Sequence, residues 1–276
     1  MTRRLNLWLL SVLLIIAIPY YWFLADAGAG IGIGSGEPRA KPLTIGALRK
    51  LADANDGQRP IELRVETVGL RMTSRNMLVA GGGLRQAPNI ISAYELIVPG
   101  TGPILIDAGI SRSSAMTHEF DRYSGEAQSR IETALAKASH VILLADKPTH
   151  NGGYPTGTHR VEQELPPSGD APYMIAPGVV VIPASGVAPE ANMVYVQLAD
   201  DREFLFTGDI AKLAVNWKEL RLPARIATRG EIASFRSETL SWLMTINALH
   251  RAAPQMTIVA GHEPSKIPFS AGTFSD

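Results

Sequence analysis

The pattern of apolar and polar positions divides the chain into three parts. Residues 5–24 are almost wholly apolar, and about twenty helical residues span roughly 30 Å, the thickness of a bilayer's hydrocarbon core. Glycines then alternate from position 28 to position 36, which predicts a Gly-rich flexible linker over residues 27–41. Beyond the linker, strand-length apolar runs alternate with helical patterns, so we expect one folded domain over residues 42–276.

The apolar N-terminal segment has the charge distribution of a membrane anchor. Arg3 and Arg4 precede it, and the first acidic residue, Asp26, follows it. The positive-inside rule predicts that residues 1–26 form a single transmembrane signal anchor, with the C-terminal domain exported to the periplasmic or extracellular face. A cleaved signal peptide is the alternative, because residues 25–27 have the A-x-A form of a cleavage site. We favour the anchor, since the apolar run exceeds the usual length of a signal-peptide core.

The folded part shows a mixture of strand and helix patterns. Short apolar runs predict strands at residues 61–68, 90–98, 103–106, 141–144, 178–182, 193–198, 203–206 and 256–260. Helical periodicity predicts helices at residues 43–52, 126–139 and 234–251. The proline-rich residues 154–177 predict a loop. Strand pairs mixed with single helices are typical of an α/β layered domain, and they argue against a β-barrel or a helical bundle.

Composition limits the chemistry available to this chain. Its 26 Lys and Arg balance 26 Asp and Glu, so no excess of positive charge indicates nucleic acid as a partner. The absence of cysteine excludes disulfides, thiolate metal sites and cysteine nucleophiles. Any transition-metal site must therefore combine carboxylates with some of the six histidines.

Candidate chemistry is concentrated where predicted strands end. Four apolar runs are followed by polar residues, and these carry Asp107, His150, Asp209 and His262. Each position alone is weak evidence for a functional site, because a strand followed by Asp and Gly is often only a turn. The ordered set of four is the informative feature, since catalytic groups collect at such strand ends.

This ordered set resembles the metallo-β-lactamase fold superfamily over roughly residues 61–264, in particular its membrane-anchored members. The family's first strand-end aspartate matches Asp107, and the end of its H-x-H-x-D-H-x-G-G motif aligns on residues 150–153. Its T-G-D strand end is intact at residues 207–209, and its G-H-x-P motif is intact at residues 261–264. The resemblance implies a four-layer αββα sandwich with the site at one edge of the sheets.

The sequence also departs from the family's ligand pattern. Four of the family's seven metal-ligand positions carry residues that bind metals poorly or not at all, namely Ala145, Lys147, Thr149 and Val187. The three surviving positions are His150, Asp209 and His262, and all belong to the family's second metal position. The resemblance therefore implies one zinc ion at most, and an emptied site with no metal is the alternative.

Two functions follow from the resemblance. In the first, His150, Asp209 and His262 hold one Zn²⁺, with His150 and Asp209 as the catalytic residues, and a metal-bound hydroxide attacks an ester, lactone, amide or thioester carbonyl of an unidentified small molecule. In the second, the chain is a catalytically inactive relative that binds a ligand or a partner at the position of the family's active-site cleft. The sequence identifies neither substrate nor partner.

Three further residues would surround the ligands without binding the metal. Asp107 would orient a ligand and fix its tautomer, and Thr149 replaces a charged ligand beside it. Lys147 falls where a ligand of the lost site would stand, so we hypothesise that its ammonium group replaces the missing cation and pairs with Asp209. A solvated loop lysine is the alternative.

Overall fold

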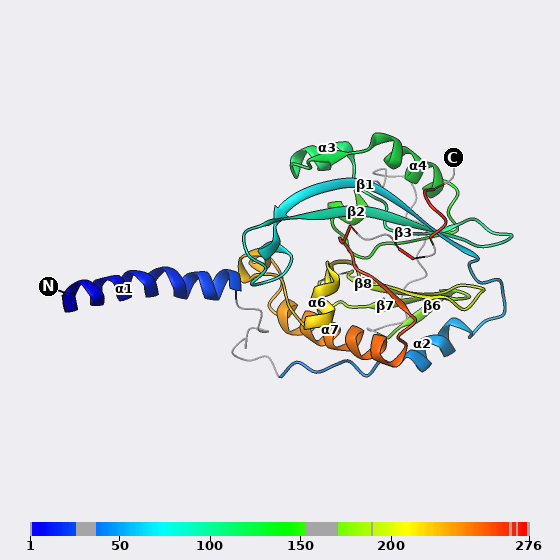
Figure 1. Cartoon of the computed structure of the whole chain (residues 1–276). Helices are drawn as coiled ribbons and strands as arrows, with labels where there is room; N and C mark the ends of the chain where they lie inside the picture. The colour runs from blue at the N-terminus through cyan, green and yellow to red at the C-terminus, as the bar shows by residue number, and fades with distance from the viewer. Residues whose placement is uncertain are drawn as a thin grey trace.

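The computed structural model describes residues 2–25, 37–152, 171–188, 190–264, 267–268 and 270–274. Most of the predicted linker and most of the predicted loop at residues 154–177 lie outside these described residues. The domain consists of two facing β-sheets with helices on their outer sides, and a long N-terminal helix projects from one end (Figure 1).

The first sheet has five strands in the order β4-β1-β2-β3-β5. Its strands are β1 (Glu62–Ser74), β2 (Gln86–Ile97), β3 (Ile104–Ile106), β4 (Arg122–Tyr123) and β5 (His140–Ile142). The long β1–β2 hairpin and β3 are antiparallel neighbours, whereas β5 runs parallel to β3. The carboxyl ends of β3 and β5 therefore meet at the same edge of the sheet.

The second sheet also has five strands, in the order β10-β9-β8-β7-β6. Its strands are β6 (Tyr173–Ala176), β7 (Val179–Pro183), β8 (Asn192–Gln197), β9 (Glu203–Phe206) and β10 (Thr257–Val259). The strands β6 to β9 form an antiparallel meander, and β10 runs parallel to β9. Consequently β9 and β10 also end at a common edge.

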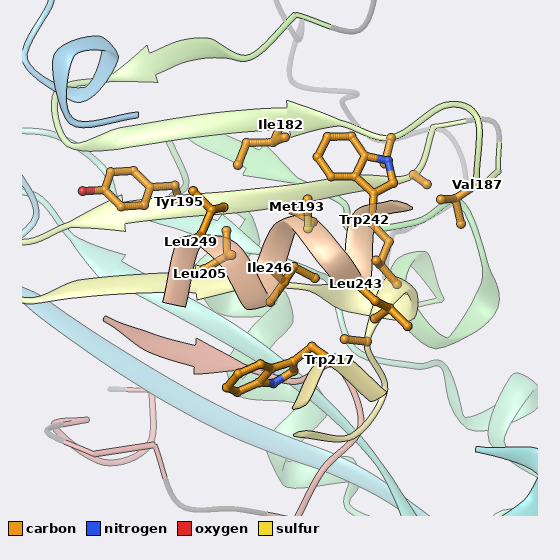
Figure 2. Packing of buried hydrophobic residues seen from close by; sticks show 14 of the residues in the cluster. Ile182, Val187, Met193, Tyr195, Leu205, Trp217, Trp242, Leu243, Ile246 and Leu249 are labelled. Atoms are coloured by element: carbon orange, nitrogen blue, oxygen red, sulfur yellow. The ribbon is translucent and has the colours of Figure 1, made fainter. Parts of the chain in front are cut away.

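Three layers of apolar side chains hold the elements together. One lies between the second sheet and the helices α2 (Ile45–Ala52), α6 (Ala214–Glu219) and α7 (Phe235–Ala252), and it includes the indoles of Trp217 and Trp242 (Figure 2). A second lies between the two sheets. The third lies between the first sheet and the helices α3 (Arg112–Thr117) and α4 (Gly125–Leu135). The predicted four-layer αββα sandwich is confirmed.

Several elements differ from the sequence prediction. The strand β1 continues to Ser74, well beyond the expected end at residue 68. The strand β6 forms inside the stretch predicted as a loop, because its residues pair with β7. The helices α3 and α6 have six residues each, which is too short to show a helical period in sequence.

The N-terminal helix α1 (Thr2–Tyr20) continues as a π-helical turn, η1 (Tyr21–Ala25). Within Arg3–Ala25 the most apolar 18-residue window has a mean hydropathy of 2.1, and none of this window is buried against the domain. By length and composition this helix can cross a membrane. The direction in which the chain crosses remains a prediction.

Candidate metal site

Four strand ends bring the predicted site residues together. Asp107 directly follows β3, and His150 lies in the short helix α5 (Pro148–Asn151) after β5. Asp209 lies in the 3₁₀ turn η3 (Gly208–Ile210) after β9, and His262 follows β10. All four side chains are buried, with exposed fractions between 1% and 9%.

Asp107 holds the first imidazole in place. Its Oδ1 accepts a hydrogen bond from the backbone N–H of Leu144 at 2.8 Å, and its Oδ2 lies 2.8 Å from Nδ1 of His150. Its φ of 64° bends the chain sharply after β3, a conformation that Asp tolerates better than most residues. Burial alone lowers the pKa of His150, whereas the carboxylates of Asp107 and Asp209 raise it to about 10. A metal ion at Nε2 would therefore displace a proton.

His262 is fixed by backbone contacts. Its Nδ1 donates to the carbonyl oxygen of Ile90 at 2.9 Å, and its own N–H donates to the carbonyl of Lys212 at 3.0 Å. A β-carbon on Gly261 would overlap the carbonyl oxygen of Gly208, so the two strand ends meet through two glycines. This close approach places His262 beside Asp209, which directly follows Gly208.

The two Nε2 atoms converge on one carboxylate oxygen. Nε2 of His262 lies 3.0 Å from Oδ1 of Asp209, and Nε2 of His150 lies 3.7 Å from the same oxygen. Nε2 of His150 is buried and has no hydrogen-bond partner among the described residues. The pKa of His262 is lowered by burial, and its Nδ1 proton points at Ile90, so its Nε2 faces the carboxylate without a proton of its own. A cation shared between these two atoms would resolve the contact.

The separations suit the ligands of one metal ion. One ligand atom from each of His150, Asp209 and His262 lies within 4.8 Å of the others. Zinc ligands lie about 2.0–2.1 Å from the ion, so two of them at a tetrahedral angle are roughly 3.3 Å apart. The observed 3.0 Å and 3.7 Å fall on either side of that value. The three residues therefore fit one ion with an open coordination position.

Two lysines also contact Asp209. Nζ of Lys147 lies 3.0 Å from Oδ2 and 3.1 Å from Glu231, and Nζ of Lys212 lies 3.2 Å from Oδ1. Burial alone raises the pKa of Asp209, but Lys212 and the imidazoles lower it well below its usual range. Burial alone lowers the pKa of Lys147, but its two carboxylate partners raise it overall, so this lysine stays charged.

The structure brings five of the predicted residues into one cluster, and Thr149 is the exception. The cluster contains Asp107, Lys147, His150, Asp209 and His262. The hydroxyl of Thr149 makes no hydrogen bond to the cluster in the part of the chain that is described. The expected pairing of Lys147 with Asp209 is present.

Sequence reasoning missed two members of this cluster. Lys212 stands three positions after Asp209, and this spacing was an available signal. Glu231 comes from a loop far along the chain, and no motif indicated it. Of the lost ligand positions, Ala145 and Val187 are buried, with exposed fractions of 2% and 1%.

The sandwich and the strand-end site together define the metallo-β-lactamase fold. A quorum-quenching N-acyl homoserine lactone lactonase is 18% identical to this chain, with a TM-score of 0.59 over 76% of this chain and 95% of the lactonase. An N-acyl homoserine lactone hydrolase, solved with N-hexanoyl-L-homoserine at its catalytic metal centre, is 17% identical, with a TM-score of 0.58 over 75% and 95%.

A probable metal-dependent hydrolase from Staphylococcus aureus is 10% identical, with a TM-score of 0.50 over 75% of this chain and 91% of that protein. At these identities the likeness shows a shared fold. No protein-family model matches the sequence, and no curated protein matches it.

Proposed function

We propose that this protein is a metal-dependent hydrolase of carbonyl compounds that holds a single zinc ion at His150, Asp209 and His262. The observation that carries the proposal is the convergence of two imidazole Nε2 atoms on Oδ1 of Asp209, at 3.0 Å and 3.7 Å. Two imidazoles and one carboxylate around an open position are a frequent catalytic zinc set. The shared fold with lactone hydrolases supports the same chemistry.

The chain's own groups prepare the site for this reaction. Asp107 and the carbonyl of Ile90 each accept from an Nδ1–H, so each ring presents Nε2 to the centre. A divalent ion held by His150, Asp209 and His262 would supply Lewis-acid chemistry, which acidifies water and polarises a carbonyl group. Lys147 is one-third exposed and stays protonated, so it supplies positive charge at the open side and cannot act as a base.

Metal content and hydrolysis test the proposal together. The full-length chain in detergent is loaded with zinc, dialysed and measured by elemental analysis. We expect about one ion per chain, lost in His150→Ala and in His262→Ala. The exposed His118 provides a matched control, and His118→Ala should keep its metal. The same samples are assayed for acid release from ester, lactone, thioester and amide substrates. Substoichiometric metal that neither site variant changes would contradict the proposal.

A catalytically inactive relative is the second candidate, and one observation favours it. Lys147 and Lys212 contact the two oxygens of Asp209, so the chain's own cations already compensate this buried carboxylate. In that case the cleft serves to bind a ligand or a partner. No bound metal together with no hydrolysis of any substrate class would support this candidate over the hydrolase.

A further inference from the structure

The N-terminal helix is joined to the domain by specific contacts. The N–H of Gly81 donates to the carbonyl oxygen of Leu24 at 2.8 Å. The guanidinium group of Arg225 lies 4.0 Å from the ring centroid of Trp22, a cation–π contact. The turn η1, which continues α1, therefore rests on two loops, one in the β1–β2 hairpin and one around the 3₁₀ turn η4 (Arg225–Thr228). Figure 1 shows α1 leaving the sandwich at this end.

The candidate metal site lies at the same end of the sandwich. β3 is antiparallel to β2, so Asp107 at the end of β3 lies toward the start of β2, where the hairpin loop contacts Leu24. The loop that follows η4 also reaches the site directly, because Glu231 contacts Nζ of Lys147 at 3.1 Å. The same loop thus touches the membrane helix and the rim of the site.

The surface of these two loops is apolar and basic. Leu84, Ile226 and Ile232 have exposed fractions of 68%, 41% and 42%. Residues 70–86 and 220–230 carry six arginines, at positions 71, 75, 85, 221, 225 and 229, and no Asp or Glu. Two acidic residues flank the second stretch: Glu219, which pairs with Arg221 at 3.4 Å, and Glu231, which pairs with Lys147. We call this set of three apolar side chains and six arginines the anchor-side surface. Basic residues near an anionic membrane are attracted to its headgroups.

We propose that the anchor-side surface lies on the anionic headgroups of the bilayer that α1 spans, so that the rim of the metal site faces the membrane. The continuity with α1 holds the surface close to the lipid, and the arginines complement anionic headgroups. Leu84, Ile226 and Ile232 enter the boundary between headgroups and acyl chains, as exposed apolar side chains of interfacial proteins do. This inference does not depend on whether a metal is bound.

Single cysteine labels test this orientation, because the natural chain contains no cysteine. Leu84→Cys and Ile232→Cys place a fluorophore on the anchor-side surface. Ile61→Cys is the matched control, since Ile61 is 49% exposed and precedes β1, whose 13 residues span about 40 Å. The full-length chain is reconstituted in vesicles of phosphatidylcholine with phosphatidylglycerol, and doxyl-labelled lipid quenches a label only where the label meets the bilayer.

We expect at least threefold stronger quenching at positions 84 and 232 than at position 61. The double variant Arg75→Glu, Arg85→Glu should reduce that quenching at least twofold. Arg251→Glu should leave it unchanged, because Arg251 lies at the far end of α7 from the η4 loop. Equal quenching at the three label positions would overturn the proposal, and so would a chain that fails to float with the vesicles.

Discussion

Replacing Asp107 by asparagine should weaken metal binding about 100-fold while leaving the fold intact. The carboxylate accepts two buried hydrogen bonds, from the N–H of Leu144 and from Nδ1 of His150, each 2.8 Å long. Asparagine offers one acceptor and one donor in the same shape. Since the backbone N–H of Leu144 always donates, the amide oxygen must face it. The amide nitrogen then faces His150, whose Nδ1 must accept, so that the proton moves to Nε2 and blocks the metal position.

The magnitudes follow from these contacts. Asp107→Asn keeps the bond to Leu144, and asparagine tolerates the φ of 64°, so the free energy of unfolding should fall by only about 1 kcal/mol. Asp107→Ala leaves the buried N–H of Leu144 without its acceptor, at a cost of about 1–3 kcal/mol, and adds about 1–2 kcal/mol for alanine at positive φ. Loss of a carboxylate that orients a metal-binding histidine lowers metal affinity by about 10- to 100-fold, and a changed tautomer places Asp107→Asn at the upper end.

Urea unfolding and zinc competition with a coloured chelator measure the two effects separately. Both variants are compared with the full-length parent chain in the same detergent. Asp107→Asn that binds zinc as tightly as the parent would refute the tautomer argument. Asp107→Ala that is as stable as the parent would refute the hydrogen-bond argument, and each result stands independently of the other.

Three further predictions follow from contacts around the site and the core. Lys147→Met should tighten zinc binding about tenfold in chelator competition, because an ammonium group beside a divalent ion repels it; an unchanged affinity would contradict this. Glu203→Gln should lower stability by about 2 kcal/mol at pH 7, since Glu203 is buried and accepts two hydrogen bonds from Arg49 at 2.8 Å and 2.7 Å. Burial alone raises the pKa of Glu203, but Arg49 lowers it overall in the folded state. The ion pair therefore contributes its full stability above the unfolded-state pKa of about 4.3, and this stability is lost as the pH falls through the lower pKa of the folded state. Urea unfolding of parent and variant should therefore differ less at pH 3 than at pH 7, and an equal difference at both would count against the prediction. Gly261→Ala should lower the free energy of unfolding by about 2 kcal/mol in thermal unfolding, because its methyl group meets the carbonyl oxygen of Gly208; unchanged stability would show that the strand ends can separate.

The layered fold was predictable because its strands are buried on at least one face. Residues 203–206 are apolar at three of four positions and are wholly buried, and they form β9 with the predicted bounds. Residues that directly follow such strands lie at the edge of the sheet. Asp107, His150, Asp209 and His262 could therefore be grouped from sequence. Their hydrogen-bond partners at Ile90 and Leu144 are backbone atoms, which leave no signature in side-chain type.

The remaining features depend on contacts between distant segments. The strand β6 is a short apolar run between Pro172 and Pro177, so the prolines favoured a loop, and pairing with β7 makes it a strand. Glu231 meets Lys147 across 84 positions of sequence, in a loop without periodicity or motif. Sequence patterns reveal local periodicity and the spacing of family motifs. They do not predict an ion pair between residues that only the tertiary fold brings together.

Val187 has a further consequence. Its side chain, 1% exposed, belongs to the apolar layer beneath α7, together with Trp217 and Trp242. An imidazole at this position would need more volume than valine leaves, and it would bury two ring nitrogens among carbon atoms. Restoring the second ion of the family therefore requires repacking this layer before any ligand is gained. The hydrophobic core as well as the ligand set therefore disfavours a metal ligand at position 187, and a Val187→His variant is expected to fold less stably than the parent chain.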